Sequence, residues 1–395
     1  MLLIPHSIGV KRSRSFLVFV NPFGGTKQGA AIFTNKVYPL FKASGCELEV
    51  IHTTRQGHGL EVAKTLRLDH YDAIVTVSGD GLIHEVLNGL AQHAEAAHAL
   101  ATPVVPIPTG SGNGLSLNLL GIEEGFDVAA AALGAIKGRH MKVDLFSFVQ
   151  GGQRSISFMS QSLGLMADVD IGTDHLRWMG DTRFMVGLIK GIAQYKRCPV
   201  KLSYKLAEQD KHKMAEAVHS RTKELAKLGR TPLASPSNSG SEVSFHDGPT
   251  AGLPPLQYLK EDEDGWVTFD EPILYVYAGK GPYVGRDFMA FPVSLPDDGL
   301  IDICVMPAGS RLDIIGGLDG AEKGAAFWNQ KLLYVKAYAY RIQPTKKQQG
   351  YLSVDGEQFP FEDFQVEVHR GLGTTLSMYG HYVAPFEPRA RPTNK

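Results

Sequence analysis

An aspartate flanked by two glycines is the residue whose type and setting point most directly to chemistry. The apolar run 73–77 is followed by Ser78-Gly79-Asp80-Gly81 and then at once by a helical pattern. An aspartate at that point can serve as a helix N-cap, but a cap needs no glycine on either side. Flanking glycines open the backbone to a phosphate and leave the carboxylate projecting into a cleft. A carboxylate beside a nucleotide can take the proton from a hydroxyl that attacks the γ-phosphate.

Two further glycine-rich loops follow apolar runs in the same way. Residues 16–20 lead into Asn21-Pro22-Phe23-Gly24-Gly25, and residues 104–108 lead into Thr109-Gly110-Ser111-Gly112-Asn113-Gly114. Backbone N–H groups at a helix start lack intrahelical partners and carry partial positive charge, so a glycine turn there can bind phosphate. The sequence contains neither G-x-G-x-x-G nor G-x-x-x-x-G-K-[ST] nor G-x-S-x-G, and His84-Glu85 lacks the second histidine of H-E-x-x-H. We therefore expect a phosphate-binding design of another kind.

The elements that must position these loops fall into two regions that differ in their predicted secondary structure. In residues 1–145 apolar runs alternate with helical patterns, which predicts an α/β domain of three layers with a largely parallel sheet. Ligands bind such sheets at the carboxyl ends of the strands, where all three loops are expected. In residues 146–380 alternating β-rich runs predict a mainly antiparallel, β-sandwich-like domain. The sequence also predicts a polar insertion at about 207–255, with one helix near 214–228, and a C-terminal tail at 381–395.

Composition and charge narrow the class of protein. The chain of 395 residues is 43% hydrophobic and 21% charged, and its formal net charge is −1, so no overall charge draws it to nucleic acid or anionic lipid. Cys46, Cys198 and Cys304 lie far apart, which argues against a disulfide framework or a zinc site and suits a cytoplasmic protein. No basic residue precedes the apolar start, and no apolar run reaches about 18 residues. We expect no signal peptide, no membrane span and at most peripheral membrane contact.

Three motifs in order, NPFGGTKQG, SGDGLIHEVLNGL and PIPTGSGNGLSLNLLG, resemble the catalytic domain shared by diacylglycerol, ceramide and sphingosine kinases. The SGDG form, with GLMADVDIGTDHLRWMGDTRF and LSVDGEQ further on, is most similar to sphingosine (long-chain-base) kinases, and the resemblance covers residues 15–370 apart from the insertion. It implies transfer of phosphate from ATP, with Mg²⁺, to the primary hydroxyl of sphingosine, sphinganine or phytosphingosine, with Asp80 as general base. The alternatives are a diacylglycerol or ceramide kinase and a nucleotide-binding scaffold without turnover.

The resemblance also implies roles for residues near the three loops and further along the chain. Glu85, one helical turn beyond Asp80, can orient the base or a magnesium ion. Arg177 and Arg183 supply the positive charge that a transferring phosphoryl group needs. The full set implied for nucleotide and phosphate is Asn21, Gly24, Gly25, Thr53, Ser78, Gly79, Gly81, Glu85, Gly110, Ser111, Asn113, Arg177, Arg183, Asp355 and Glu357. The sequence assigns no metal ligands.

Asp168 and Asp170 are the candidates for the lipid head group. On a strand their side chains would share one face, and on a helix they would splay apart. The resemblance pairs Asp170 with the amino or hydroxyl head of the base, and a partly buried carboxylate benefits from a cationic partner. A neutral amide head would leave Asp170 without that pairing, at a cost of about 1–3 kcal/mol, which argues against ceramide.

The lipid tail requires an apolar pocket in the second domain. Each buried CH₂ contributes about 0.8 kcal/mol, so about a dozen methylenes supply on the order of 10 kcal/mol before ordering costs. The candidate lining residues are Phe158, Leu163, Leu165, Met166, Phe184, Phe288, Met289 and Met306. Residues 184–204 mix apolar and basic side chains, which is typical of a segment that lies on a membrane, binds a calmodulin-like partner, or packs as a helix on its own domain.

Overall fold

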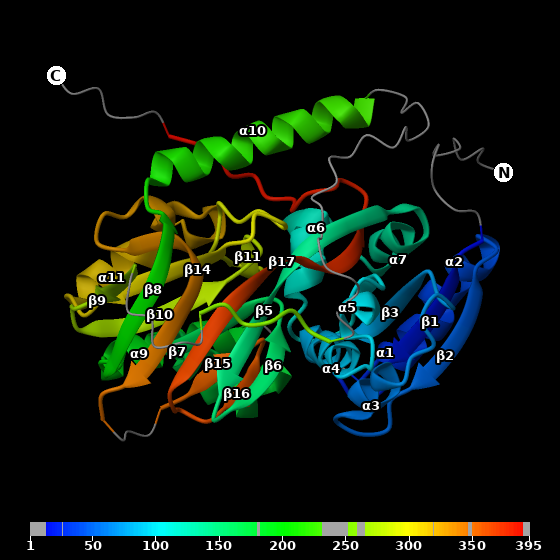
Figure 1. The fold of residues 1–395 in the computed structure, drawn as a ribbon, viewed down its shortest axis with the longest axis horizontal. Helices are drawn as coiled ribbons and strands as arrows, with labels where there is room; N and C mark the ends of the chain where they lie inside the picture. Colours follow the sequence, from blue (N-terminus) through cyan, green and yellow to red (C-terminus); the bar gives the residue numbers. More distant parts are fainter. Residues whose placement is uncertain are drawn as a thin grey trace.

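The computed structural model describes residues 13–25, 27–179, 182–230, 252–258, 265–318, 320–346 and 350–389. An α/β domain forms one end of the molecule and a β-rich domain the other (Figure 1).

A parallel sheet of four strands, in the order β2-β1-β3-β4, forms the centre of the α/β domain. Its strands are β1 (Ser15–Val20), β2 (Glu47–His52), β3 (Ala73–Ser78) and β4 (Val104–Pro108), and its helices are α1 (Gly29–Ile32), η1 (Phe33–Val37), α2 (Tyr38–Ala43), α3 (His58–Lys64), α4 (Asp80–Ala91), α5 (Ala96–Ala99), α6 (Gly114–Glu124) and α7 (Val128–Lys137). Side chains alternate along β1, so that Phe16 and Val18 pack with η1, α2 and α7, whereas Leu17 and Phe19 pack with α3, α4 and α5. Both faces of the sheet are therefore covered, and the predicted three-layer α/β domain is confirmed.

The second domain is built on one antiparallel sheet of eleven strands. Its main path runs β16-β15-β7-β10-β13-β14-β17-β5-β6, with β8 pairing to β14 and β9 to β8. The strands are β5 (Arg139–Gln150), β6 (Gln153–Ser157), β7 (Ser160–Gly164), β8 (Val200–Glu208), β9 (Trp266–Phe269), β10 (Ile273–Gly279), β13 (Ile301–Pro307), β14 (Leu333–Pro344), β15 (Leu352–Val354), β16 (Glu357–Phe359) and β17 (Phe364–Ser377). The sheet curls around a core to which nearly every strand contributes. The mainly antiparallel prediction is confirmed, in the form of one curled sheet.

Helices and one short ribbon cover the outside of this sheet. They are α8 (Leu165–Asp170), η2 (Ile171–Met179), α9 (Thr182–Gln194), α10 (Lys211–Arg230), α11 (Arg311–Leu318), η3 (Ala321–Lys323), η4 (Ala325–Trp328) and the pair β11 (Tyr283–Gly285) and β12 (Phe288–Met289). The helix expected at 214–228 is α10, which lies along one side of the molecule (Figure 1) and buries Met214 and Ala215 against the domain. Residues 231–251 of the predicted insertion lie outside the described residues.

Two asparagine side chains join the domains by mimicking a strand backbone. Asn88 of α4 donates to the carbonyl of Ile156 on β6 and accepts from its N–H, both at 2.8 Å. Asn118 of α6 makes the same pair of bonds with Tyr283, at 2.9 and 2.7 Å. Strand β5, which begins at Arg139, contains the domain division that the sequence predicts at residue 145. The orientation of α4 and α6 toward the second domain is thus fixed by direct hydrogen bonds.

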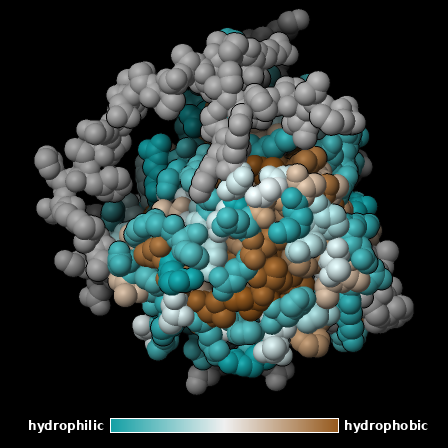
Figure 2. Space-filling model, turned by 90° about the vertical axis from the view of Figure 1, so that its right-hand side faces the viewer, coloured by the Kyte–Doolittle hydropathy of each residue, from teal (hydrophilic) through white to brown (hydrophobic). Residues whose placement is uncertain are grey.

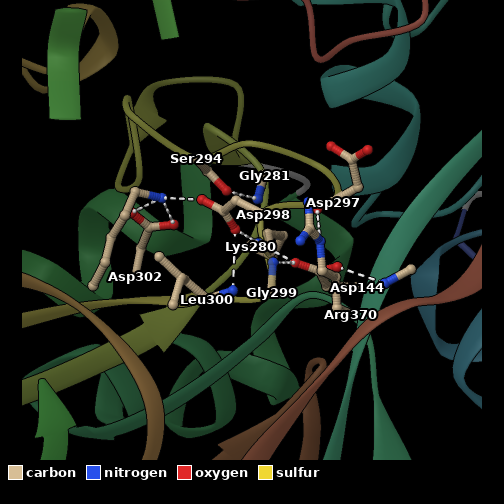
Figure 3. Close-up of polar contacts among 12 residues, drawn as sticks. Asp144, Lys280, Gly281, Ser294, Asp297, Asp298, Gly299, Leu300, Asp302 and Arg370 are labelled. Atoms are coloured by element: carbon tan, nitrogen blue, oxygen red, sulfur yellow. Dashed lines mark hydrogen bonds and ion pairs between the residues drawn. The ribbon is translucent and has the colours of Figure 1, made fainter. Parts of the chain in front are cut away.

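A buried ionic cluster ties several strands of the second domain together (Figure 3). The ammonium of Lys280 lies 2.6 Å from Asp144 Oδ2 and also contacts Asp298. Lys336 bridges Asp298 and Asp302 at 2.9 and 3.0 Å. Burial alone lowers the pKa of Lys280, but the charges of Asp298 and Asp144 outweigh it and raise that pKa. Paired charges of this kind can be buried, whereas removal of one partner is costly.

The surface of the α/β end is mostly hydrophilic around a central apolar strip (Figure 2). Across the described ranges, no helix combines the length and apolar character that crossing a membrane requires.

Candidate active site

A cavity of about 1000 Å³ lies where the two domains meet, at the carboxyl ends of β1, β3 and β4. The three glycine-rich loops form one wall, and α8, α9 and the β15–β16 turn contribute the facing wall. Of the residues implied for nucleotide and phosphate, the cavity brings together Asn21, Gly24, Gly25, Thr53, Ser78, Gly79, Gly81, Glu85, Gly110, Ser111, Arg183, Asp355 and Glu357. Asn113 does not line the cavity, and the side chain of Arg177 lies outside the described residues.

The glycines of the three loops pack directly against one another. A Cβ on Gly79 would lie 2.6 Å from the carbonyl oxygen of Gly112, and a Cβ on Gly110 would lie 2.3 Å from the Cα of Gly79. Gly25 has a positive φ of +54°, and a Cβ there would lie 2.6 Å from the Thr109 carbonyl. Glycine is therefore required for loop-to-loop contact as well as for an open backbone.

Two asparagines set the shape of these loops. The Asn21 Oδ1 atom accepts from the N–H groups of Phe23 and Gly24 at 2.9 and 3.1 Å, and its Nδ2 donates to Ser78 Oγ at 3.3 Å. Asn113 closes its own loop through two bonds with the Gly110 backbone, at 3.1 and 2.8 Å. Asn113 thus shapes the glycine-rich loop 109–114 from outside the cavity.

Asp80 is buried at the first position of α4, yet its side chain makes no capping bond to that helix. Its carboxylate accepts instead from Gly114 N–H at 2.6 Å and Leu115 N–H at 3.3 Å, at the start of α6. Burial raises the pKa of Asp80 to about 6, against the lowering effect of these two hydrogen bonds. A carboxylate with that pKa is ionised at neutral pH and is matched to general-base work.

Glu85 and Thr53 line the cavity beside Asp80. The carboxylate of Glu85 accepts from the N–H of Gly59 at 3.1 Å, near the start of α3. Thr53 is buried at the end of β2 and donates to the Val20 carbonyl at 3.4 Å. Both residues therefore support the loops while they face the cavity.

The two aspartates proposed for the lipid head group are separated by the helix that carries them. Asp170 ends α8 and lines the cavity, whereas Asp168 does not. Burial raises the pKa of Asp168, while the nearby Lys196 and Lys190 partly offset that effect. The splayed arrangement expected for a helix is thus the one observed, and only Asp170 is available to a ligand in the cavity.

Asp170 and Arg183 lie side by side. Ser353 Oγ donates to Asp170 Oδ2 at 2.6 Å, and Arg183 Nη2 lies 3.8 Å from Asp170 Oδ1. Arg183 also donates to the Asp170 carbonyl at 3.1 Å and to Thr173 Oγ1 at 3.3 Å, and it stacks over the Phe184 ring at 4.2 Å. The guanidinium expected at the nucleotide phosphates is therefore packed beside the carboxylate of Asp170.

Asp355 is surrounded by donors. Its carboxylate accepts from Ser157 Oγ at 2.8 Å, from Met159 and Ser160 N–H at 2.9 Å, and from Phe158 N–H at 3.1 Å. It also pairs with His84 Nδ1 of α4 at 2.8 Å. Burial alone would lower the pKa of His84, but the hydrogen bond and charge of Asp355 raise it above its ordinary value. These contacts make Asp355 a link between the domains.

Glu357 approaches the loop of Asp80 from the second domain. Its Oε1 atom would lie 3.0 Å from a Cβ on Gly81.

The sequence did not single out His84, Ser157 or Ser353 as residues of the site. The spacing of four residues between Asp80 and His84 was a usable signal, because it places both on one face of a helix.

Only part of the expected tail pocket lines the cavity. Met166, Phe184 and Phe288 do so, together with Leu188, Tyr277 and Val284. The other expected residues pack inside the domain cores: Phe158, Leu163, Leu165, Met289 and Met306. The apolar character of these residues alone did not distinguish those that line the cavity from those that pack in the core.

The basic amphipathic stretch 184–204 is divided between two elements. Its first part belongs to α9, which exposes Met185, Val186 and Ile189, and its last part belongs to β8. A partner that binds a continuous helix would thus meet only the α9 portion. In the described part of the chain, no group of three or more His, Cys, Asp or Glu side chains is arranged to bind a metal ion.

Comparison with known proteins agrees with this geometry. The family model "Diacylglycerol kinase catalytic domain" matches residues 15–148. A diacylglycerol kinase structure from Bacillus anthracis superposes with a TM-score of 0.57 at 18% identity, covering 93% of this chain and 98% of that one, and so shares the fold. The chain therefore has the fold of the diacylglycerol kinase class, whose members are lipid kinases.

Relatives that match along most of the chain show which kinases of that class it resembles. Sphingoid long chain base kinase 4 of Schizosaccharomyces pombe is 33% identical over 372 residues, which are 93% of this chain and 76% of the relative. Sphingosine kinase 1 of Homo sapiens is 28% identical, with 89% of this chain and 88% of the relative covered. The chain belongs to the sphingoid long chain base kinase family.

Proposed function

We propose that this kinase transfers the γ-phosphoryl group of ATP to the primary hydroxyl of a sphingoid base, which is sphingosine, sphinganine or phytosphingosine. The observation that carries the proposal is that Asp80 and Asp170 line one cavity from opposite domains. A carboxylate suited to proton abstraction thus faces the same space as a carboxylate suited to an ammonium.

Asp80 takes the hydroxyl proton as the hydroxyl oxygen bonds to the γ-phosphorus and the bond to the bridging β–γ oxygen breaks. Its two backbone donors keep the carboxylate in place, and a pKa of about 6 leaves it ionised at neutral pH. Removing such a base typically costs 10²- to 10⁴-fold in rate.

The glycine-rich loops bind the nucleotide phosphates through backbone N–H groups. Carboxylates of Glu85 and Glu357 line the same region. Mg²⁺ commonly binds through one or two carboxylates together with phosphate oxygens, so this donor set fits the ion. When bound, Mg²⁺ supplies positive charge to the phosphate oxygens.

The head of the base pairs with Asp170, and its tail lies along Met166, Phe184 and Leu188. The exposed apolar residues of α9, which are Met185, Val186 and Ile189, contact the membrane from which the lipid is taken. Phe184 and Met185 follow one another on α9 and also line the cavity, so the membrane contact and the substrate site are continuous.

Transfer of label from γ-labelled ATP tests the proposal, with sphinganine, phytosphingosine, ceramide and diacylglycerol offered separately in detergent. We expect label in the free bases alone, a loss of 10²- to 10⁴-fold in Asp80→Asn, and nucleotide binding that survives in that variant. Asp170→Asn should raise KM for the bases about tenfold, whereas the matched control Asp168→Asn, on the same helix but outside the cavity, should not. Label in ceramide or diacylglycerol would overturn the assignment of Asp170.

A further inference from the structure

We propose that Ser353 is a positioning residue for head-group recognition, which orients the carboxylate of Asp170 toward the ammonium of the substrate. The inference rests on the proposed function, because it assigns Asp170 to the head group. Ser353 itself does not line the cavity and acts through Asp170.

The position of the Ser353 hydroxyl is fixed by its strand. β15 pairs with β7 on one side and β16 on the other, so that Ser353 lies in register with Ser162 and Gln358. Its neighbours Leu352 and Val354 are fully buried in the core of the curled sheet. Because side chains alternate along a strand, Ser353 faces the opposite side, toward α8. Its Cα cannot shift without moving a strand that is paired on both sides.

The bond that Ser353 makes is a strong one. Its Oγ donates to Asp170 Oδ2 at 2.6 Å, and Ser353 is only 2% exposed. A hydroxyl that donates to a carboxylate in a water-poor setting is a charge-assisted donor, which favours the ionised carboxylate. The Asp170 side chain itself is 28% exposed, so the same carboxylate is reachable from the cavity.

A carboxylate has about four acceptor positions, so the Ser353 bond leaves capacity for an ammonium. The carboxylate of Asp170 is approached from two sides, because Ser353 Oγ donates to Oδ2 at 2.6 Å and Arg183 Nη2 lies 3.8 Å from Oδ1. Ser353 donates from outside the cavity, so its bond does not occupy the space that a ligand would use.

The same short strand also reaches the catalytic domain. Asp355 follows Ser353 by two residues and pairs with His84 on the helix that begins with Asp80. Removal of the Ser353 hydroxyl leaves every Asp355 contact in place, since none of these involves Ser353. The contact of Ser353 with Asp170 can therefore be removed without disturbing the contacts by which Asp355 links the two domains.

Initial-rate kinetics of full-length wild type, Ser353→Ala, Ser353→Cys and Ser162→Ala with sphinganine in detergent test this role. We expect KM for sphinganine to rise about tenfold in Ser353→Ala and less in Ser353→Cys, which keeps the volume but donates weakly. KM for ATP should change less than twofold in both. Ser162→Ala removes a buried hydroxyl one strand away and should behave as wild type.

A pH profile separates positioning from a merely structural role. Without its donor, Asp170 should take up a proton at higher pH. The acidic limb of kcat/KM also reports the general base Asp80, so binding of sphinganine is measured against pH in the Asp80→Asn background, where we expect Ser353→Ala to move the loss of affinity to higher pH. An unmoved loss of affinity with unchanged KM for sphinganine would overturn the proposal, as would equal losses in the sphinganine and ATP parameters.

The wild-type arm distinguishes this proposal from the proposed function. If wild type phosphorylates no free base, or if Asp170→Asn leaves KM for the bases unchanged, the assignment of Asp170 fails and the role of Ser353 fails with it. If wild type and Asp170→Asn behave as expected while Ser353→Ala and Ser353→Cys match wild type, only the role of Ser353 fails.

Discussion

Replacing Asp80 by asparagine should stabilise the fold near neutral pH while it slows transfer by about 10²- to 10⁴-fold. Burial raises the pKa of Asp80 from 3.8 to about 6, a difference of 6 − 3.8, or about 2.2 units. At 1.36 kcal/mol per unit, the ionised carboxylate costs the folded state about 3 kcal/mol. The sign follows from proton binding: the folded state binds this proton more tightly, so stability is lost as pH rises from about 4 to about 6.

Asparagine removes that cost but also removes one acceptor. Its NH₂ group cannot accept from either Gly114 or Leu115, so one backbone N–H loses its partner, at about 1–2 kcal/mol. The net gain at pH 8 should be about 1–2 kcal/mol, and the difference between the two proteins should fall by about 2 kcal/mol between pH 8 and pH 4.5.

Urea unfolding of both proteins at the two pH values measures this difference. Asp127→Asn is the matched control, because Asp127 is an exposed N-cap of α7 and asparagine caps about as well. An Asp80→Asn variant that is less stable than wild type at pH 8, or a difference that does not depend on pH, would refute the reasoning.

Three further substitutions test the domain joint, the ionic cluster and the membrane contact. Asn88→Ala leaves the buried N–H and carbonyl of Ile156 without their partner and should cost about 2–4 kcal/mol in urea unfolding; a cost under 0.5 kcal/mol would contradict this. Lys280→Met leaves Asp144 and Asp298 buried without their shared cation, so we expect a loss of about 3–5 kcal/mol in thermal unfolding, and an unchanged midpoint would argue against the cluster. Ile189→Glu, at a residue 65% exposed on α9, should lower the vesicle-bound fraction roughly tenfold, whereas Leu133→Glu, 41% exposed on α7, should leave it unchanged. Equal binding by the two would contradict the membrane role of α9.

The sequence predicted the fold class because its signals are local. Apolar runs that end in glycine turns and continue as helices place the turns at one edge of a parallel sheet, and the loops of Asn21, Asp80 and Gly110 do meet there. The stretch Ala167-Asp168-Val169-Asp170 left strand and helix open, and the two differ in whether the aspartates share a face. The structure has the helix α8 there, with Leu165 and Ala167 buried.

The missed features depend on contacts between distant residues. His84 meets Asp355 across 271 positions of sequence, and Ser353 meets Asp170 across 183. No local pattern encodes such distances. The tail pocket is a different case, because Leu163, which packs in the core, and Met166, which lines the cavity, are equally apolar.

The pattern S-x-D-G occurs twice, and its two copies show how the surroundings of an aspartate set its role. In Ser78-Gly79-Asp80-Gly81 the second residue lies against the Gly112 carbonyl, where only glycine fits. In Ser353-Val354-Asp355-Gly356 the second residue is a valine buried in the core of the sheet. The first copy opens a helix at the cavity, and the second ends a strand.

Both aspartates are buried and both line the cavity, but the number of donors around them differs. Asp355 accepts from three backbone N–H groups and a serine hydroxyl and pairs with His84, so its carboxylate has little capacity left for a substrate proton. Asp80 accepts from two N–H groups, one of them at 3.3 Å, and its pKa is raised to about 6. A buried carboxylate that is only partly satisfied and borders a cavity is the one that can accept a proton, which is why we assign the base to the first copy and the domain link to the second.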